Sequence, residues 1–454
     1  MEHALPRNPD ALIVGAGVGG SVAARRLADA GLRVLLIDRE PAADVGRKVC
    51  GNGIADDGVE SIARYTERPS GAEIATRVTR GTIVLKDGTT TIEIPKGGVV
   101  LNRLVFGQRL LADAIEAGAI FRDRCSCVGW SDRTDNSVRL RDDGGAESDV
   151  TARVVIDASG YRAVLTRGGG PSHPDPISRE DVATGYREIV PLTEPLERPD
   201  DATIVLAPEG ARGGYGWIFP MGYRLANVGI GAPLAAARAP IRDTYRLFVD
   251  SQDKLHAADP VEAGGGLLPF RRPLGTFVGD GFMSVGDAAC HANPLHGGGI
   301  TPAVIAAGMA SDVAARALGD GDVSTAALWP YNVAFMREVG CSHAGQDFVR
   351  RFLDSLTDAD FMFVTREFAR ADLMMKTFGR GGARPRLRAA FGILARAVRR
   401  PRLATTLVRA GQLLDKIQKT YLDYPDSPSR FESWFGQVEF QRRSLARITT
   451  GGEQ

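Results

Sequence analysis

The sequence has no long apolar run and no excess of either charge. The polar N-terminal stretch MEHALPRNPD leads directly into an apolar segment, and nowhere do about 18 apolar residues follow one another. We therefore expect neither a signal peptide nor a spanning helix. The 56 basic and 55 acidic residues of the 454-residue chain almost cancel, so overall electrostatics do not favour a nucleic-acid partner.

Cysteine is scarce and shows no paired spacing. The sequence holds an odd number of cysteines, and none of them form the pairs typical of a metal site, so we expect no bound metal. Cys125 and Cys127 are too close together for a comfortable disulfide. This pattern favours a reducing, cytoplasmic setting. The five residues are Cys50, Cys125, Cys127, Cys290 and Cys341.

The segment ALIVGAGVGGSVAARRLADAGLRVLLID predicts a strand, a glycine turn, a helix and a second strand. Gly15 permits the tight turn, Gly17 lets a pyrophosphate approach the backbone, and Gly20 lets the helix pack closely. Asp38 ends the second strand and is placed to accept hydrogen bonds from an adenosine ribose. The segment predicts a site for FAD or NAD; the alternative is a glycine turn that holds no ligand.

A later segment distinguishes between these cofactors. GFMSVGDAA predicts a strand that ends at Gly286 and Asp287, and glycines 297–299 lead into a helix. Asp287 can accept from a ribityl or ribose hydroxyl, while the glycine amides can face a ring edge that gains negative charge on reduction. We therefore expect a flavin, with a ligand-free helix cap as the alternative.

Four stretches occur in the order seen in FAD-dependent oxidoreductases of the aromatic-hydroxylase-like superfamily: GAGVGG with Asp38, LNRLVFGQRLLADAIEAGA, VVIDASG and VGDAACHANPLHGGGITPA. Within that superfamily, KVCGNGI and GGYGWIFPMGYRLANVGIG resemble the geranylgeranyl reductase family. The resemblance implies an α/β fold in which a Rossmann-like FAD-binding domain is joined to an antiparallel-sheet substrate domain and a helical C-terminal region.

The resemblance and the glycine motifs together give a set of FAD-binding residues. The sequence departs from the family pattern at three positions: Gly107 stands where an aspartate is usual, Ala163 where a serine is frequent, and His296 where a threonine is common. The expected FAD-binding residues are Gly15, Gly17, Gly20, Asp38, Arg39, Cys50, Gly51, Arg103, Asp157, Gly286, Asp287, Gly298, Gly299 and Ile300.

The domain organisation follows from these motifs and from the strand pattern between them. We expect the first part of the FAD-binding domain at 1–165, interrupted by substrate-domain segments around 75–100, and its second part at 281–330. Short apolar runs broken by Gly and Pro predict an antiparallel-sheet substrate domain at 166–280. Residues 331–454 are expected to be a helical C-terminal region.

The run YGWIFP places three aromatic side chains on one face of a predicted strand. The resemblance implies that Tyr215 and Trp217 line the substrate, whereas Phe219 is expected to pack. The alternative is that all three belong to the core.

The expected reaction is saturation of C=C double bonds in a long isoprenoid chain carried on a lipid, a quinone or a diphosphate. It needs a hydride from reduced FAD and a proton, and aromatic faces would ease cationic character at the double bond. Cys50 and His296 are the candidate catalytic residues; packing and loop hydrogen bonding are their alternatives. NAD(P)H or a separate carrier is expected to supply the electrons. His291 is expected to be structural.

Two other functions remain open from the residues alone. A flavin monooxygenase or halogenase would use the same fold with molecular oxygen, and YGWIFP is similar to the tryptophan motif of flavin halogenases. The second alternative is a flavin-binding protein that acts at a membrane without catalytic turnover.

The C-terminal region is basic. Between Lys376 and Lys419 there are twelve Lys or Arg residues and one acid, Asp415. Apolar residues recur at helical spacing through 387–398, so the pattern predicts a basic amphipathic helix suited to peripheral contact with an anionic membrane surface. The alternative is a solvated basic face packed on the core.

Overall fold

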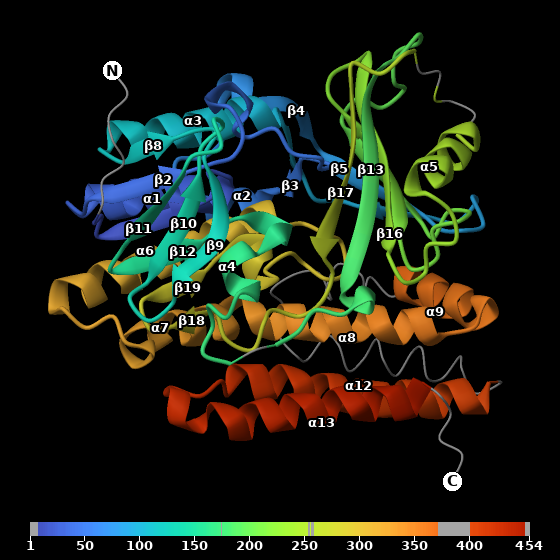
Figure 1. Cartoon of the computed structure of the whole chain (residues 1–454). Helices are drawn as coiled ribbons and strands as arrows, with labels where there is room; N and C mark the ends of the chain where they lie inside the picture. The colour runs from blue at the N-terminus through green and yellow to red at the C-terminus, as the bar shows by residue number, and fades with distance from the viewer. Residues whose placement is uncertain (1–7, 174, 253–254, 256–257, 371–399, 450–454) are drawn as a thin grey trace.

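A computed structural model describes residues 8–173, 175–252, 255, 258–370 and 400–449 (Figure 1). It contains a mainly parallel sheet, a large antiparallel sheet and a set of C-terminal helices, so the predicted fold class is confirmed. The domain boundaries inferred from the sequence stay a prediction.

The first sheet has six strands, and all but β18 run parallel to their neighbours. Its short central strands are fully buried, which explains why they consist of continuous apolar runs. In sheet order, the strands are β18 (Val278–Gly279), β19 (Phe282–Ser284), β12 (Val154–Asp157), β1 (Ala11–Val14), β2 (Val34–Ile37) and β8 (Ile120–Arg122).

Alternate residues of β1 face opposite layers. Ala11 and Ile13 pack in the cluster that includes the helices, whereas Leu12 and Val14 pack on an antiparallel meander. The helices on the first face are α1 (Val18–Asp29), α3 (Arg103–Glu116) and α6 (Ile300–Asp320). The meander consists of β9 (Ser126–Asp132), β10 (Ser137–Arg141) and β11 (Glu147–Thr151).

The second large sheet, which we call the wall, is drawn upright in Figure 1 and stands beside the six-stranded sheet and its helices. Helix α5 (Ile241–Asp250) covers one face of this sheet through Tyr245 and Phe248. All neighbouring pairs are antiparallel except β14 and β5. In sheet order the strands are β17 (Glu262–Pro269), β13 (Val182–Pro191), β16 (Leu225–Pro233), β15 (Tyr215–Pro220), β14 (Asp201–Leu206), β5 (Arg80–Val84) and β6 (Thr91–Ile94).

A small three-stranded sheet lies early in the chain, directly after the segment that carries Cys50. Its strands, in order, are β3 (Gly53–Ala55), β7 (Gly98–Leu101) and β4 (Ile74–Val78), and α2 (Asp56–Ile62) follows β3. Because β3 begins at Gly53, this sheet fixes the C-terminal end of the Cys50 segment.

The C-terminal region is helical where it is described. Helices α12 and α13 form a layer beneath α8 in Figure 1. The apolar positions predicted at 387–398 lie outside the described residues. None of the helices within the described ranges is long and apolar enough to cross a membrane. The helices are α7 (Thr325–Phe335), the π-helical η6 (Met336–Gly340), α8 (Cys341–Ser355), α9 (Asp358–Arg370), α12 (Pro401–Leu422) and α13 (Phe431–Thr449).

Candidate active site

The first glycine turn shows why each of its glycines is needed. Gly15 has a φ of +104°, and a Cβ there would lie 2.5 Å from the carbonyl oxygen of Ala158. A Cβ at Gly20 would lie 1.8 Å from the carbonyl oxygen of Gly15, so only glycine lets α1 approach the turn. A Cβ at Gly17 would meet no atom within 4 Å, which leaves its backbone approachable from outside.

Asp38 follows β2 and braces this turn. Its Oδ2 accepts a hydrogen bond from the Ala16 amide at 2.6 Å, and its Oδ1 accepts from the Glu40 amide at 2.9 Å. The side chain of Arg39 is exposed and pairs with Glu40. Asp38 therefore lies where the sequence predicts, at the end of the strand beside the glycine turn.

The second loop joins β19 to α6 and carries Asp287. This residue lies in the short helix η5 (Gly286–Ala289), and its side chain is 10% exposed. Its carboxylate Oδ2 lies 2.7 Å from the Nζ of Lys48. Gly299 is close to the other oxygen, because a Cβ there would lie 3.4 Å from Oδ1. Ile300 begins α6 and is buried.

Arg103 provides a test of whether the site suits FAD. It begins α3 and is 7% exposed, and its Nε and Nη1 atoms are buried without a hydrogen-bond partner among the described residues. Burial lowers the pKa of Arg103 below its usual value, although the nearby Cys50 and Asp287 oppose this shift. A buried guanidinium needs acceptors, and the phosphates, ribityl chain and ring carbonyls of FAD are all acceptors. The residues present therefore fit the cofactor.

Asp157 ends β12 and is surrounded by local hydrogen-bond donors. It is fully buried, and its carboxylate accepts five hydrogen bonds from Ser159, Leu165 and Thr166. These bonds hold the loop after β12 and the start of α4 (Val164–Arg167). The carboxylate thus supports the loop after β12, and direct contact with FAD stays a prediction.

The segment from Cys50 to Gly53, which we call the cysteine loop, is pressed onto the wall. A Cβ at Gly51 would lie 2.9 Å from the ring of Phe219, and one at Gly53 would lie 3.2 Å from it. The Asn52 amide donates to the Sγ of Cys50 at 3.3 Å. Phe219 therefore packs, as predicted, and its partner is the cysteine loop.

Trp217 lies across a glycine of the next strand. It pairs in register with Gly229 of β16, and a Cβ at Gly229 would lie 2.2 Å from the indole ring. The indole Nε1 donates to Oδ1 of Asn227 at 2.9 Å, and Nδ2 of Asn227 donates to the carbonyl of Cys50 at 2.8 Å. Since Gly216 faces Phe248 of α5, the aromatic face of β15 points the other way, toward the cysteine loop.

Tyr215 connects the same wall to the second loop. Its hydroxyl donates to the backbone carbonyl of His296, and burial raises the pKa of Tyr215. His296 is exposed, yet desolvation by the surrounding protein lowers its pKa to about 4. Its Nδ1 accepts from the Gly298 amide at 3.2 Å, so the neutral ring carries its proton on Nε2.

His291 is fully buried, stacks on Phe335 with ring centroids 3.9 Å apart, and accepts from the Gly286 amide through Nδ1. Burial lowers its pKa well below the usual value. These contacts agree with the structural role expected for it.

The wall and the segment before the cysteine loop contain residues that the sequence reasoning missed. Arg187 of β13 is 2% exposed, pairs with Glu262, and has two guanidinium nitrogens without a described partner. Lys48 and Asn227 stand inside the two quoted family-like stretches, so their place in KVCGNGI and NVGIG was the available signal. Nothing local in the sequence marked Arg187.

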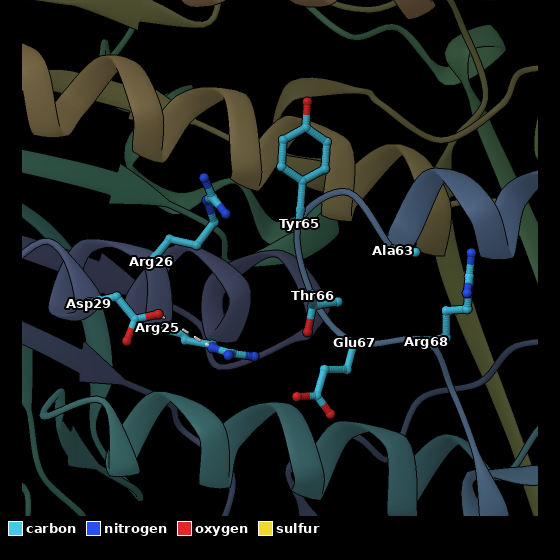
Figure 2. A pocket seen from close by; sticks show the side chains of 8 residues that line it. All are labelled: Arg25, Arg26, Asp29, Ala63, Tyr65, Thr66, Glu67 and Arg68. Atoms are coloured by element: carbon cyan, nitrogen blue, oxygen red, sulfur yellow. Dashed lines mark ion pairs between the residues drawn. The ribbon is translucent and has the colours of Figure 1, made fainter.

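A separate surface pocket of about 620 Å³ lies between α1 and the segment after α2 (Figure 2). None of the predicted site residues lines it, and its arginines Arg25, Arg26 and Arg68 pair with neighbouring acids. We therefore do not assign it to the reaction.

Comparison with known proteins agrees with this geometry. Residues 10–184 match the family described as FAD dependent oxidoreductase, and 181–268 match the geranylgeranyl reductase catalytic domain. The crystal structure of a geranylgeranyl bacteriochlorophyll reductase-like protein from Thermoplasma acidophilum has a TM-score of 0.75 at 23% identity, covering 89% of this chain and 99% of that one. A myxobacterial chondrochloren halogenase has a TM-score of 0.62 at 22% identity, covering 78% and 84%. The fold and the site thus define an FAD-dependent oxidoreductase.

Sequence relatives narrow this class. A digeranylgeranylglycerophospholipid reductase 2 of Methanosphaera stadtmanae is 30% identical, with 80% of this chain and 92% of that protein covered. The digeranylgeranylglycerophospholipid reductase of Sulfolobus acidocaldarius is 28% identical, with 95% and 96% covered. The chain belongs to the geranylgeranyl reductase family.

Proposed function

We propose that this protein saturates C=C double bonds in a geranylgeranyl-type isoprenoid chain carried on a lipid, and that the substrate lies along the edge where the cysteine loop meets the aromatic face of β15. The relatives named for a digeranylgeranyl glycerophospholipid, similar over most of both chains, carry the proposal. The aromatic wall of Tyr215 and Trp217 suits an apolar, unsaturated chain.

The two glycine loops, Asp38, Arg103 and Asp287 are proposed to hold FAD. When bound and reduced, FAD supplies the hydride. NAD(P)H or a separate electron carrier remains the proposed reductant.

The residues of the wall and the cysteine loop have three tasks in this reaction. The faces of Tyr215 and Trp217 stabilise cationic character at the substrate double bond. Cys50, whose Sγ lies in the loop that touches the wall, is the proposed donor of the proton. His296 is neutral near pH 7 because its pKa is about 4, so it orients groups through its Nε2 proton rather than acting as a cation.

The outer face of α12 and α13 is proposed to rest on an anionic membrane, where such a substrate resides. Exposed Phe440, Val408 and Leu422 lie on the same two helices as exposed basic residues, a mixture suited to a charged lipid surface. The exposed basic residues of α12 are Arg402, Arg409, Lys416 and Lys419. Stronger sedimentation with anionic than with zwitterionic vesicles, lost in a combined Arg409→Gln, Lys416→Gln and Phe440→Ser variant, is the expected result; equal sedimentation of both proteins would contradict it.

The reaction itself is tested by mass spectrometry of a geranylgeranylated glycerophospholipid incubated with the protein and chemically reduced FAD, with and without oxygen. A gain of about 2 Da per double bond without oxygen is expected for reduction. A gain of about 16 Da that depends on oxygen would indicate an oxygenase and overturn the proposal.

A further inference from the structure

Asn227 joins two parts of the site that are 177 residues apart in the sequence. It is fully buried on β16, on the face of the wall that carries Trp217 and Phe219. Its amide makes one hydrogen bond to each side: Oδ1 accepts from the Trp217 indole at 2.9 Å, and Nδ2 donates to the Cys50 carbonyl at 2.8 Å.

An amide is the side chain that can make both bonds. The indole Nε1 is only a donor and the Cys50 carbonyl is only an acceptor, so the group between them must accept on one side and donate on the other. An aspartate would keep the indole bond but would turn a second acceptor toward the carbonyl. An apolar residue would leave both partners buried and unpaired, which is costly.

Two close steric contacts, one at Trp217 and one at the cysteine loop, also restrict how the loop and the wall meet. Gly229 has no room for a Cβ beside the indole, so Trp217 lies close against the backbone of β16. Gly51 has no room for a Cβ above Phe219, so the loop can approach closely enough for Asn227 to reach the carbonyl. The amide is therefore a polar connection in a close-packed contact, next to the bond that Arg187 Nη2 donates to the Lys48 carbonyl at 3.4 Å.

We infer that Asn227 is a positioning residue, which fixes the Cys50 thiol relative to the Trp217 indole so that proton donor and cation-stabilising face meet one double bond. The consequence for catalysis rests on the proposed function. The positioning itself is a property of the folded protein and can be measured without substrate.

The first test follows the alkylation of Cys50 by iodoacetamide, resolved from the other cysteines by peptide mass spectrometry. Asn227→Asp should raise the Cys50 alkylation rate several-fold, because its second oxygen repels the carbonyl and releases the loop. Trp217→Phe removes the indole donor and part of the ring but keeps the bond from Asn227 to the Cys50 carbonyl, so its Cys50 rate should rise less than that of Asn227→Asp. Asn227→Thr, a good strand former with a hydroxyl too short for both partners, repeats the test should the aspartate variant not fold.

The matched control is Asn332→Asp. Asn332 is also fully buried and also bridges two groups, the Phe277 amide and the Thr276 hydroxyl, but it does not touch the cysteine loop. This variant should leave the Cys50 alkylation rate unchanged. An equal rise in Asn332→Asp, or no rise in either Asn227 variant, would overturn the inference.

The second test measures reduction of the geranylgeranylated phospholipid by Asn227→Asp loaded with FAD. We expect unchanged FAD content and a turnover at least about tenfold lower, with the loss in kcat rather than KM, because a displacement of the reacting groups is costly even when binding is kept. Normal turnover with a faster-reacting Cys50 would overturn the catalytic part of the inference. If the unmodified protein does not reduce the lipid, the proposed function fails, and the alkylation data still decide the positioning.

Discussion

Lys48 and Asp287 are 239 residues apart in the sequence, and the Nζ of Lys48 lies 2.7 Å from the Oδ2 of Asp287. The pair ties the residues just before the cysteine loop to the second loop, between β19 and α6, as Asn227 ties the cysteine loop to the wall. Because the Lys48 side chain is 53% exposed, the pair contributes only about 0–1 kcal/mol to stability. Its importance is geometric, since it brings the cysteine loop beside the expected FAD-binding carboxylate.

Asp287→Ala should lose bound FAD, because it removes the acceptor at the start of the second loop. The visible absorbance of the purified protein measures the flavin content. Asp312→Ala is the control: it removes an acid that is partly exposed, lies on α6 away from the loop, and pairs with Arg26. The control should keep its flavin, and full flavin content in Asp287→Ala would remove that residue from the cofactor site.

Cys50→Ala should keep FAD and lose lipid reduction. The thiol is half-buried, and its described hydrogen bond comes from the neighbouring Asn52 amide, so its removal leaves the two glycine loops intact. Turnover and flavin absorbance are measured on the same preparation, with Cys341→Ala, another half-buried cysteine, as the control. Unchanged turnover in Cys50→Ala would reduce this residue to packing.

Gly229→Ala should lower both stability and turnover. Its Cβ would lie 2.2 Å from the Trp217 indole and 2.7 Å from the Arg187 Cβ, so the ring must leave its place; overpacking of this kind costs about 1–3 kcal/mol. Gly265→Ala on β17 is the matched control, since its nearest neighbour is an ordinary 3.4 Å away. Chemical denaturation and Trp fluorescence measure the two variants. Equal unfolding free energies would show that the indole moves at no cost.

Contiguous segments were predictable because local rules govern them. The turn between β1 and α1, Asp38 at the end of β2 and the helix from Ile300 all lie within single stretches whose spacing determines their structure. Alternation along YGWIFP likewise placed Tyr215 and Trp217 on one face.

Long-range contacts were not predictable from the same rules. Nothing in NVGIG shows that its asparagine meets a backbone carbonyl 177 residues earlier, because the sheet register and the path of the cysteine loop decide that contact. The hydrogen bonds of Asp157 to nearby amides and hydroxyls were not predictable either, while its contact with FAD stays a prediction. The four-residue helix α4 that supplies some of these amides is too short to leave a periodic pattern.

Asp175→Asn should destabilise the protein by about 3–5 kcal/mol, because it leaves two buried arginines without their shared carboxylate. Asp175 accepts from Arg271 at 2.8 Å and Arg272 at 2.7 Å, and these guanidinium groups keep its pKa below the usual value although burial opposes them. Asp149→Asn, at an exposed pair with Arg139, should change the unfolding free energy by less than about 1 kcal/mol. Similar decreases in unfolding free energy in both variants would show that the buried ion pairs of Asp175 stabilise the protein no more than the exposed pair of Asp149.

The stability should fall as the pH drops from about 6.5 toward 3, and His343 is one cause. This residue is buried on α8, and burial lowers its pKa to about 3, whereas an unfolded histidine titrates near pH 6.5. In this window the unfolded chain binds a proton that the folded chain does not, so the free energy of unfolding rises with pH by up to about 1.4 kcal/mol per pH unit for each such group.

His343→Gln should flatten this dependence between pH 4 and pH 6. Denaturant unfolding at a series of pH values gives the slope of the unfolding free energy against pH. In His343→Gln this slope should fall by up to the contribution of one proton. His291 and His296, whose pKa values are also lowered, should still contribute to it. An unchanged stability slope in His343→Gln would mean that its ring is protonated in the folded protein.

His296 gives a separate prediction about activity. A proton donor must be protonated, so a histidine donor with an ordinary pKa would lose activity as the pH rises above about 6.5. Because the pKa of His296 is about 4, the pH profile of lipid reduction near pH 6.5 should have the same shape in His296→Gln and in the unmodified protein. A loss of activity above about pH 6.5 that disappears in His296→Gln would restore that residue as a proton donor.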